Sequence, residues 1–384
     1  MVNAREIYMT SSVAVKNPGD ALVVKNSGDR EAHQLSLDAF YREEEIRWRD
    51  LINCAQKILN GEIVVCPFCG STNTVKAGAR RCKYGVKQRY LCKDCERRFT
   101  RSTIFRIANL PINLIAIIAS KLARGYAVRD ISRDLAEHHG VKISPPTVIN
   151  AGCRVALLLN EMEILILKHF KGAFKKPRTW YIDDTFRKTR RRHSEGRRYF
   201  YVIAVLDEET RYCLVLDVST KRDIKAFKRA IGKALKLTNG IRPAIIRSDS
   251  YAAQIEAIEV LMSNVRVDSK SKSEDFSHIN LIEAFFSSLR KTLCKQSHYS
   301  SVANLQCRAD LIRHRHNFLK SFGGRTPAEA LGIVLPGLAI EDSARGFESL
   351  IKLAIALRLA KVRLDKEDRR KKKQTGGLLQ WIHI

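Results

Sequence analysis

The spacing of apolar residues predicts alternating strands and helices in the second half of the chain. Three runs rich in β-branched and aromatic residues predict strands, and the turn "DEET" joins the last two as a hairpin: "WYIDDTFRK", "RRYFYVIAVLDEET" and "RYCLVLDVST". A helix "KRDIKAFKRAIGKALKLT", a strand "AIIRSDS", a helix "YAAQIEAIEVLM", a strand "NVRVDSK" and a helix "HINLIEAFFSSLRK" follow. The order β-β-β-α-β-α-β-α predicts a mixed five-stranded sheet with helices packed on it.

The first half of the chain has a different texture. Residues 1–35 show no sustained periodicity and are expected to be disordered, whereas 36–60 predict an amphipathic helix capped by Ser36. Residues 114–123 and 128–137 predict two helices, with a turn at Gly125 and a break at Gly140. A third helix is expected after Ser144, with Pro145 and Pro146 in its first turn.

This helical stretch is typical of a helix-turn-helix unit. In that geometry the third helix lies in the major groove of DNA, and Thr147 and Asn150 would stand near base edges. Helix pairs with the same spacing also occur as plain bundles, so a scaffold role remains the alternative. Near the C-terminus, 341–364 predict another helix, which packs either on its own chain or on a second copy, before a charged, mobile tail.

Four cysteines form two close pairs, Cys66–Cys69 and Cys92–Cys95, with 22 residues between the pairs. Two such knuckles let four thiolates close tetrahedrally on one Zn²⁺ ion, which leaves no open position for catalysis. The spacing therefore predicts a structural zinc ribbon. Cys82 is interpreted as a free thiol outside the ligand set.

The chain of 384 residues is strongly basic, with 69 Lys and Arg against 40 Asp and Glu and a net charge of +29. Such an excess favours a nucleic-acid partner, although anionic membranes and acidic proteins also attract basic chains. Basic clusters lie far apart, in "KGAFKKPR", "FRKTRRRHSEGRR" and "RRKKK". Neither a signal peptide nor 18 consecutive apolar residues occur, so we expect a cytoplasmic protein without membrane spans and with mostly reduced cysteines.

Three carboxylates stand out by their positions in the predicted elements. Asp183 lies within a strand of large apolar residues, where a charge is costly unless it is paired or metal-bound. Asp249 ends a buried strand, and Glu283 lies on the last helix with 33 residues between them. Such a triad would hold two Mg²⁺ ions, which take oxygen ligands and promote in-line phosphoryl transfer.

Other readings of the acids stay open. Glu283 lies at the margin of an apolar stripe, and on this helix alone it reads as a rim glutamate paired with Arg290 or Ser287. The doubled acid at 183–184 makes Asp184 a second candidate for the first ligand, because alternation lets only one of the two face the site. Four further acids are expected in turns or strand ends with solvated or capping roles: Asp207, Asp217, Asp223 and Asp268.

With "YIDDTFRK", "IIRSDSYAA" and "NLIEAFFSSLRK" in this order, the chain resembles the DD(E) transposases of insertion sequences. The trailing "HNFLKSFGGRTPAEALGI" is similar to their C-terminal signature, and the zinc ribbon and helix-turn-helix fit the same organisation. The resemblance covers roughly residues 60–335. It implies an integrase-type α/β ribonuclease-H-like catalytic core in which Asp183, Asp249 and Glu283 are the catalytic, metal-binding acids.

The resemblance also implies how DNA would be bound and processed. Arg290 matches a basic residue that follows the glutamate of the family and would contact phosphate. The enzyme would use two Mg²⁺ or Mn²⁺ ions to cleave at terminal inverted repeats, and the freed 3′-hydroxyl would then attack target DNA. Further phosphate contacts are expected from the basic residues around the acids, namely Lys291, Arg187, Lys188, Arg190, Arg191 and Arg192.

The leading hypothesis is therefore an insertion-sequence transposase that acts as a homodimer or higher oligomer on duplex DNA and associates with the nucleoid when bound. The alternatives are a ribonuclease-H-like nuclease that only hydrolyses, and a catalytically inert DNA-binding regulator descended from a transposase. The expected organisation is a disordered segment 1–35, helix 36–60, zinc ribbon 61–102, helix-turn-helix 103–172, catalytic domain 173–335, and helical segment with basic tail 336–384.

Overall fold

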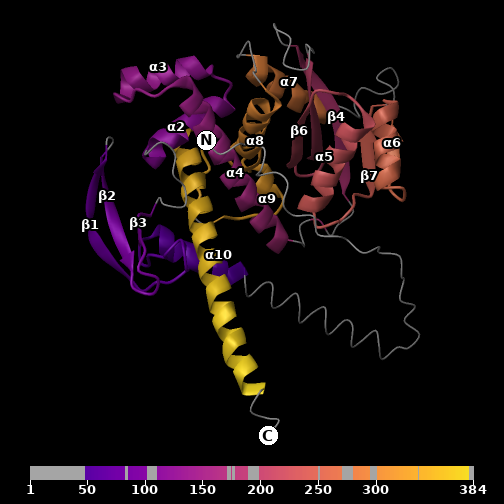
Figure 1. The fold of residues 1–384 in the computed structure, drawn as a ribbon. Helices are drawn as coiled ribbons and strands as arrows, with labels where there is room; N and C mark the ends of the chain where they lie inside the picture. The colour runs from indigo at the N-terminus through magenta and orange to yellow at the C-terminus, as the bar shows by residue number, and fades with distance from the viewer. Residues whose placement is uncertain are drawn as a thin grey trace. The chain divides into compact units, whose positions relative to one another are not determined.

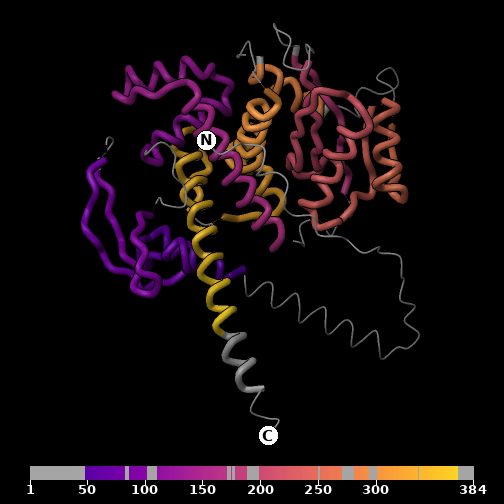
Figure 2. Tube along the Cα trace, in the orientation of Figure 1, coloured from indigo at the N-terminus to yellow at the C-terminus, as the bar shows by residue number. Residues whose placement is uncertain are grey.

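The computed structural model describes most of the chain after residue 47 (Figure 2). The predicted disordered segment 1–35, the first part of the predicted helix 36–60, and Arg190, Arg191 and Arg192 lie outside the described residues. The described ranges are 48–82, 85–101, 110–170, 174, 178–188, 199–249, 251–269, 280–294, 301–335 and 337–379.

A helix at 48–59 leads into a small antiparallel sheet (Figure 1). Its strands are β1 (Thr74–Cys82), β2 (Gly85–Cys92) and β3 (Arg98–Phe99), in the order β1-β2-β3. Tyr90 of β2 pairs with Phe99 of β3, and their rings stack at 5.7 Å. Cys66 and Cys69 precede β1, and Cys92 and Cys95 lie at the turn from β2 to β3.

Three helices follow where the periodicity predicted them: α2 (Ile112–Ala123), α3 (Val128–His139) and α4 (Pro145–His169). Gly125, between the first two, has φ of 83°, and a Cβ there would lie 2.0 Å from the carbonyl oxygen of Thr292. Only glycine fits this backbone conformation and this contact. Gly140 ends α3 in the left-handed region, and α4 begins after Ser144 with Pro145 in its first turn.

The large sheet contains β4 (Thr179–Lys188), β5 (Tyr199–Asp207), β6 (Cys213–Ser219), β7 (Ile245–Ser248) and β8 (Arg266–Ser269). Its order is β6-β5-β4-β7-β8, with β4, β5 and β6 antiparallel and β4, β7 and β8 parallel. The helices α5 (Ile224–Leu237), α6 (Ala252–Leu261) and α7 (Asn280–Cys294) complete the order predicted from the sequence. A mixed five-stranded sheet flanked by helices fits a ribonuclease-H-like core.

The pleat of β4 and β5 divides the sheet between two apolar clusters. Ile182 and Ile203 point into the cluster that contains the buried side of α5 and α6. Tyr181 and Val202 point the other way, toward α7 and α8 (Val302–Phe318). Figure 1 shows helices on both sides of the sheet. Side chains on both faces of β4 are therefore buried, which explains why the sequences of these strands are nearly continuous apolar runs.

The C-terminal part comprises α9 (Pro327–Ala330) and the long α10 (Ala344–Leu379). Phe347, Leu350 and Leu357 of α10 are fully buried within the chain. Of the two alternatives for 341–364, packing on its own chain is the one observed. The tail expected to be mobile continues α10 as helix through Leu379, and an Arg363–Glu367 pair at 3.0 Å supports one of its turns.

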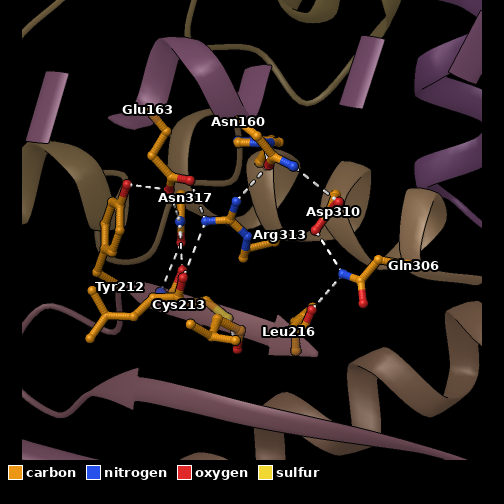
Figure 3. A network of polar contacts seen from close by, with 12 residues as sticks. Asn160, Glu163, Tyr212, Cys213, Leu216, Gln306, Asp310, Arg313 and Asn317 are labelled. Atoms are coloured by element: carbon orange, nitrogen blue, oxygen red, sulfur yellow. Dashed lines mark hydrogen bonds and ion pairs between the residues drawn. The ribbon is translucent and has the colours of Figure 1, made fainter. Parts of the chain in front are cut away.

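A buried polar network joins α4 to α8 and the large sheet (Figure 3). Glu163 of α4 forms an ion pair with Arg313 of α8, and the hydroxyl of Tyr212 donates to Glu163 at 2.6 Å. Arg313 also donates to Asn160 at 2.8 Å, while Asn317 donates to the carbonyl of Cys213 at 2.9 Å. The helix whose first two turns were predicted to read DNA is thus fastened to the sheet by its second half.

The same two helices are joined covalently. Cys153 of α4 and Cys307 of α8 form a disulfide, with 4.9 Å between their Cα atoms. The sequence did not predict this pair, which forms because α4 and α8 pack side by side and bring together thiols far apart in the sequence. The other seven described cysteines, Cys82 among them, are free thiols. Among the described helices, none has the length and apolar character needed to cross a membrane.

Candidate active site and cysteine cluster

The first acid of the proposed triad lies within β4. Asp183 is 5% exposed, and its Oδ1 accepts a hydrogen bond from the backbone N–H of Asp184 at 2.7 Å. On this strand Asp183 shares a face with Tyr181 and Thr185, the face covered by α7. A carboxylate buried to this extent is costly without compensating positive charge.

The second acid follows the neighbouring strand. Because β7 runs parallel to β4 with Arg247 opposite Tyr181, Asp249 falls two residues further on, as Asp183 does on β4. The register therefore places Asp183, in the middle of β4, level with Asp249, which follows the carboxyl end of β7, where α/β sheets commonly bind ligands. Oδ1 of Asp249 accepts from the backbone N–H of Tyr251 at 3.3 Å.

Arg222, just before α5, connects Asp184 with Asp249. Its Nε donates to Asp184 at 2.7 Å, and its Nη2 donates to Asp249 at 3.3 Å. The ring of Tyr251 lies 3.7 Å beneath the guanidinium, and its hydroxyl donates to the carbonyl of Arg222 at 2.9 Å. Burial tends to lower the pKa of Arg222, but the hydrogen bond and charge of Asp184 and the charge of Asp249 raise it above its ordinary value.

The third acid, Glu283, lies in the first turn of α7 and its side chain is 33% exposed. Arg290, two turns further along the helix, donates to Glu283 at 3.2 Å and to the hydroxyl of Thr185 at 3.3 Å. The structure thus contains the Glu283–Arg290 pair along the helix, which the sequence offered as the alternative to a catalytic role. The same arginine places Glu283 over the β4 face that carries Asp183.

Asp183 and Asp249 lie on adjacent strands and Glu283 on the helix over the Asp183 face, but the three carboxylates do not form a compact ligand cluster in this structure. Among the described residues, the four ribbon cysteines are the only group of three or more His, Cys, Asp or Glu ligand atoms that lie within 4.8 Å of one another. Arg222 and Arg290 supply the positive charge beside Asp249 and Glu283. Carboxylate oxygens are nonetheless the donors that Mg²⁺ and Mn²⁺ take, so the chemistry of this set fits such ions.

The four other acids have structural partners. Asp223 caps α5 by accepting from Ala226, and Asp207 accepts from Thr210 in the β5–β6 turn, as capping roles require. Asp268 lies 3.8 Å from Arg247 in an ion pair. The expectation was wrong for Asp217, which is buried within β6 and paired with Arg229 and Lys233 of α5, because an amphipathic helix covers that strand.

The predicted DNA-contacting residues are dispersed. Lys291 is exposed on α7, Arg187 is half-buried on β4, and the side chain of Lys188 lies outside the described part. In the second turn of α4, Asn150 is exposed, while in the first turn the hydroxyl of Thr147 lies 2.9 Å from that of Ser144. Sequence reasoning missed Arg222 and Thr185, because an arginine before a helix and a threonine in a strand carry no distinguishing local signal.

The four ribbon cysteines do form a compact cluster. Cys66 Sγ lies 3.6 Å from Cys95 Sγ, and Cys69 Sγ lies 3.6 Å from Cys92 Sγ. Zn–S bonds of about 2.3 Å in a tetrahedron place sulfurs about 3.8 Å apart, so this spacing is compatible with Zn²⁺. Burial raises the pKa of Cys66 to about 12, a cost that a bound cation offsets.

Comparison with known proteins adds a family to this geometry. Residues 178–320 match the model of a DDE domain family, that of IS240-type transposases. Among solved structures, the chain is similar to one in a cryoEM structure of a simian T-cell lymphotropic virus intasome in complex with PP2A regulatory subunit B56 gamma. That similarity has 13% identity and a TM-score of 0.31, and covers 40% of this chain and 53% of that chain. No curated protein matches the chain.

The match to a DDE domain suggests a nucleotidyl-transfer enzyme, and the mixed five-stranded sheet flanked by helices fits a ribonuclease-H-like core. Within that class, residues 178–320 are a DDE domain of the insertion-sequence transposase family. The family match implies use of divalent metal ions. It covers the large sheet and the helices α5 to α8, and leaves the cysteine cluster and α2 to α4 outside the matched range.

Proposed function

We propose that this chain binds the terminal inverted repeats of a mobile DNA element, cleaves at the element ends and joins them to target DNA. The observation that carries the proposal is the placement of three acids in a DDE domain. Asp183 and Asp249 are level with each other in the register of adjacent parallel strands, and Glu283 lies on the helix packed over the Asp183 face. Transposases of this class perform phosphoryl transfer without a covalent protein–DNA intermediate.

Asp183, Asp249 and Glu283 would hold the divalent ions of the reaction. Bound there, a pair of ions supplies charge stabilisation to the attacking and leaving oxygens. We assign the first position to Asp183 because its face of β4 is the one that α7 and Glu283 cover. Asp184, which points to the other face, acts with Arg222 to hold Asp249 in place.

In this proposal the side chain of Arg290 pairs either with Glu283 or with a DNA phosphate. It is paired with Glu283 in the structure, yet its guanidinium is 45% exposed and can turn to a DNA phosphate once other positive charge reaches the glutamate. Lys291 and Arg187 would extend the basic surface beside the acids. The first two turns of α4, with Thr147 and Asn150, would read base edges in the major groove.

Two element ends must be processed together, so the proposal includes at least a dimer. Each copy would contribute one DDE domain to a paired-end complex. Sedimentation of the protein with and without a repeat duplex measures this directly, and a complex that contains a single copy per two ends contradicts it.

The test of function uses purified full chain, Mg²⁺ or Mn²⁺, and a labelled duplex that carries the terminal repeat. We expect cleavage and strand-transfer products that disappear in Asp183→Asn, Asp249→Asn and Glu283→Gln, while binding of the duplex persists. Glu259→Gln, an exposed acid on α6, is the matched control. Full activity in Glu283→Ala ends the proposal, cleavage without joined products indicates a nuclease, and binding without cleavage indicates an inert regulator.

A further inference from the structure

The hairpin of β1 and β2 is a basic arm that the proposed function does not use. Between Thr74 and Cys92 the sequence carries six basic residues and no acidic one: Lys76, Arg80, Arg81, Lys83, Lys87 and Arg89. Such a density in 19 residues exceeds the average of this already basic chain. A ribbon with this composition attracts a polyanion.

The strand register concentrates part of this charge on one face. Arg80 lies directly opposite Lys87, so their side chains leave the ribbon on the same side. Arg89 lies two residues beyond Lys87 and shares that face. Like charges directly opposite each other destabilise a strand pair, and the hairpin has no acid of its own to offset them. DNA phosphates along this face would offset the repulsion between Arg80 and Lys87, so that these charges would favour binding.

The arm is also open to a large partner. Most of β1 is exposed, and Val86 near the tip is 66% exposed. In its sheet β1 is an edge strand, and β3 pairs with only Tyr90 and Leu91 of β2. The strand segments 79–82 and 85–88 therefore form a two-stranded ribbon, and no described third strand of this sheet pairs with them.

The base of the arm is rigidly held. A Cβ on Gly70, in the first cysteine knuckle, would lie 2.6 Å from the carbonyl oxygen of Val362, so the knuckle backbone rests directly on α10. Lys366 of α10 also donates to Asp94 in the second knuckle at 2.9 Å. Above the base, Gly78 has φ of 76° at a bulge, and Gln88 donates to its carbonyl at 2.8 Å. This bulge increases the twist of the ribbon.

The dimensions of the arm match a groove of DNA. From Ala79 opposite Gln88 to Cys82 opposite Gly85 the ribbon advances three residues, about 10 Å at about 3.3 Å per residue. The major groove is about 12 Å wide and about 8.5 Å deep and admits a two-stranded ribbon. We infer that this ribbon, formed by residues 79–82 and 85–89, enters the major groove of duplex DNA, where Arg80, Lys87 and Arg89 contact phosphates. This site rests on the proposed function and adds a second DNA contact, separate from the first two turns of α4.

The test compares two triple variants of the full chain with equal loss of charge. Arg80→Gln, Lys87→Gln and Arg89→Gln alter the arm, whereas Lys225→Gln, Lys236→Gln and Lys361→Gln alter exposed lysines on α5 and α10. Fluorescence anisotropy measures the dissociation constant for a repeat duplex and for a random duplex over a range of NaCl concentrations. Zinc content and circular dichroism must equal those of the parent, which shows that the ribbon remains folded.

We expect the arm variant to reduce the slope of log K against log salt by about 2 to 3, because each lost phosphate contact removes about 0.9. The control variant should change it by less than about 1. Methylation of guanine N7, which lies in the major groove, should interfere with binding of the parent at positions that no longer interfere in the arm variant. Equal slopes for both variants overturn the inference and leave the arm as a charged, solubilising edge, and interference confined to adenine N3 overturns the major-groove placement.

The outcome is distinguishable from failure of the proposed function. If the parent cleaves and joins repeat ends while the arm variant binds as the control does, the arm inference alone fails. If the parent produces no cleavage but loses duplex affinity in the arm variant only, the transposase proposal fails and the arm remains a DNA contact.

Discussion

Removing one partner of the buried Glu163–Arg313 pair should strongly destabilise the protein. Their side chains are 1% and 6% exposed, so neither charge can be hydrated if the other is removed. Glu163→Gln keeps the shape of the side chain but leaves the guanidinium of Arg313 beside a neutral amide. Arg313 then retains the carbonyl of Leu214 at 3.3 Å and the amide oxygen of Asn160 at 2.8 Å as acceptors.

The expected magnitude follows from the desolvation of the remaining charge. Breaking a buried ion pair by removing one partner costs about 3–5 kcal/mol of the free energy of unfolding. The hydrogen bond from Tyr212 to Glu163 at 2.6 Å weakens as well, because an amide oxygen replaces a carboxylate. Arg313→Met should cost a similar amount, since it leaves Glu163 as the unpaired buried charge.

The assay is urea-induced unfolding followed by the fluorescence of tryptophan, since Trp180 is buried in β4 beside this region. Glu163→Leu combined with Arg313→Met removes both charges, and we expect it to destabilise about as much as either single change rather than their sum. Arg229→Gln is the control, because its pair with Asp217 is half-exposed on the arginine side and should matter by about 1 kcal/mol at most. A loss below about 1 kcal/mol in Glu163→Gln would refute the reasoning, because it would show that the groups left around Arg313, the buried Asp310 among them, suffice without Glu163.

Three further predictions concern pH, the acids and the cysteines. Burial lowers the pKa of His316 to about 4, so between about pH 6.5 and pH 4 the unfolded state binds a proton that the folded state does not. The free energy of unfolding should therefore fall by about 3 kcal/mol as the pH is lowered through that window. Urea unfolding at several pH values measures this fall, and His316→Gln should not show it. Arg222→Met should lower the cleavage rate about 10²-fold with duplex affinity unchanged, because Asp184 and Asp249 lose the cation that positions them. Lys225→Met is the control. An equal loss of duplex affinity in Arg222→Met would contradict a positioning role for Arg222. Cys66→Ser should abolish zinc binding and raise amide hydrogen exchange in the β1–β3 unit but not in the large sheet, and unchanged protection without zinc contradicts the structural role.

Local sequence signals predicted the elements that depend on local physics. The helices α2, α3 and α4 lie where apolar periodicity, Gly125, Gly140 and the prolines at the start of α4 predicted them. The eight core elements follow in the predicted order for the same reason, since period and turn chemistry are properties of short segments. The close cysteine pairs likewise predicted their own cluster, because each knuckle supplies two ligands from one turn.

The site was only partly accessible to such reasoning. Asp183, Asp249 and Glu283 could be selected because each is an acid at an unusual position in its own element. Only one of Asp183 and Asp184 can lie on the face of β4 that α7 covers. The sequence of the strand alone does not predict which face that is. Arg222 was missed for a related reason, since its partners belong to two strands that meet it only in the folded sheet.

The sequence by itself therefore determined the elements, their order, the cysteine cluster and the acids from which a site can be built. Only the tertiary structure decided that Asp217 is buried, that Cys153 reaches Cys307, and that Glu163 pairs with Arg313. Helix and strand preferences act between neighbours in the chain, so they are legible in short windows. The disulfide and the Glu163–Arg313 pair join residues 154 and 150 positions apart, and the burial of Asp217 depends on the helix that covers its strand, so packing of the sheet and helices sets these contacts.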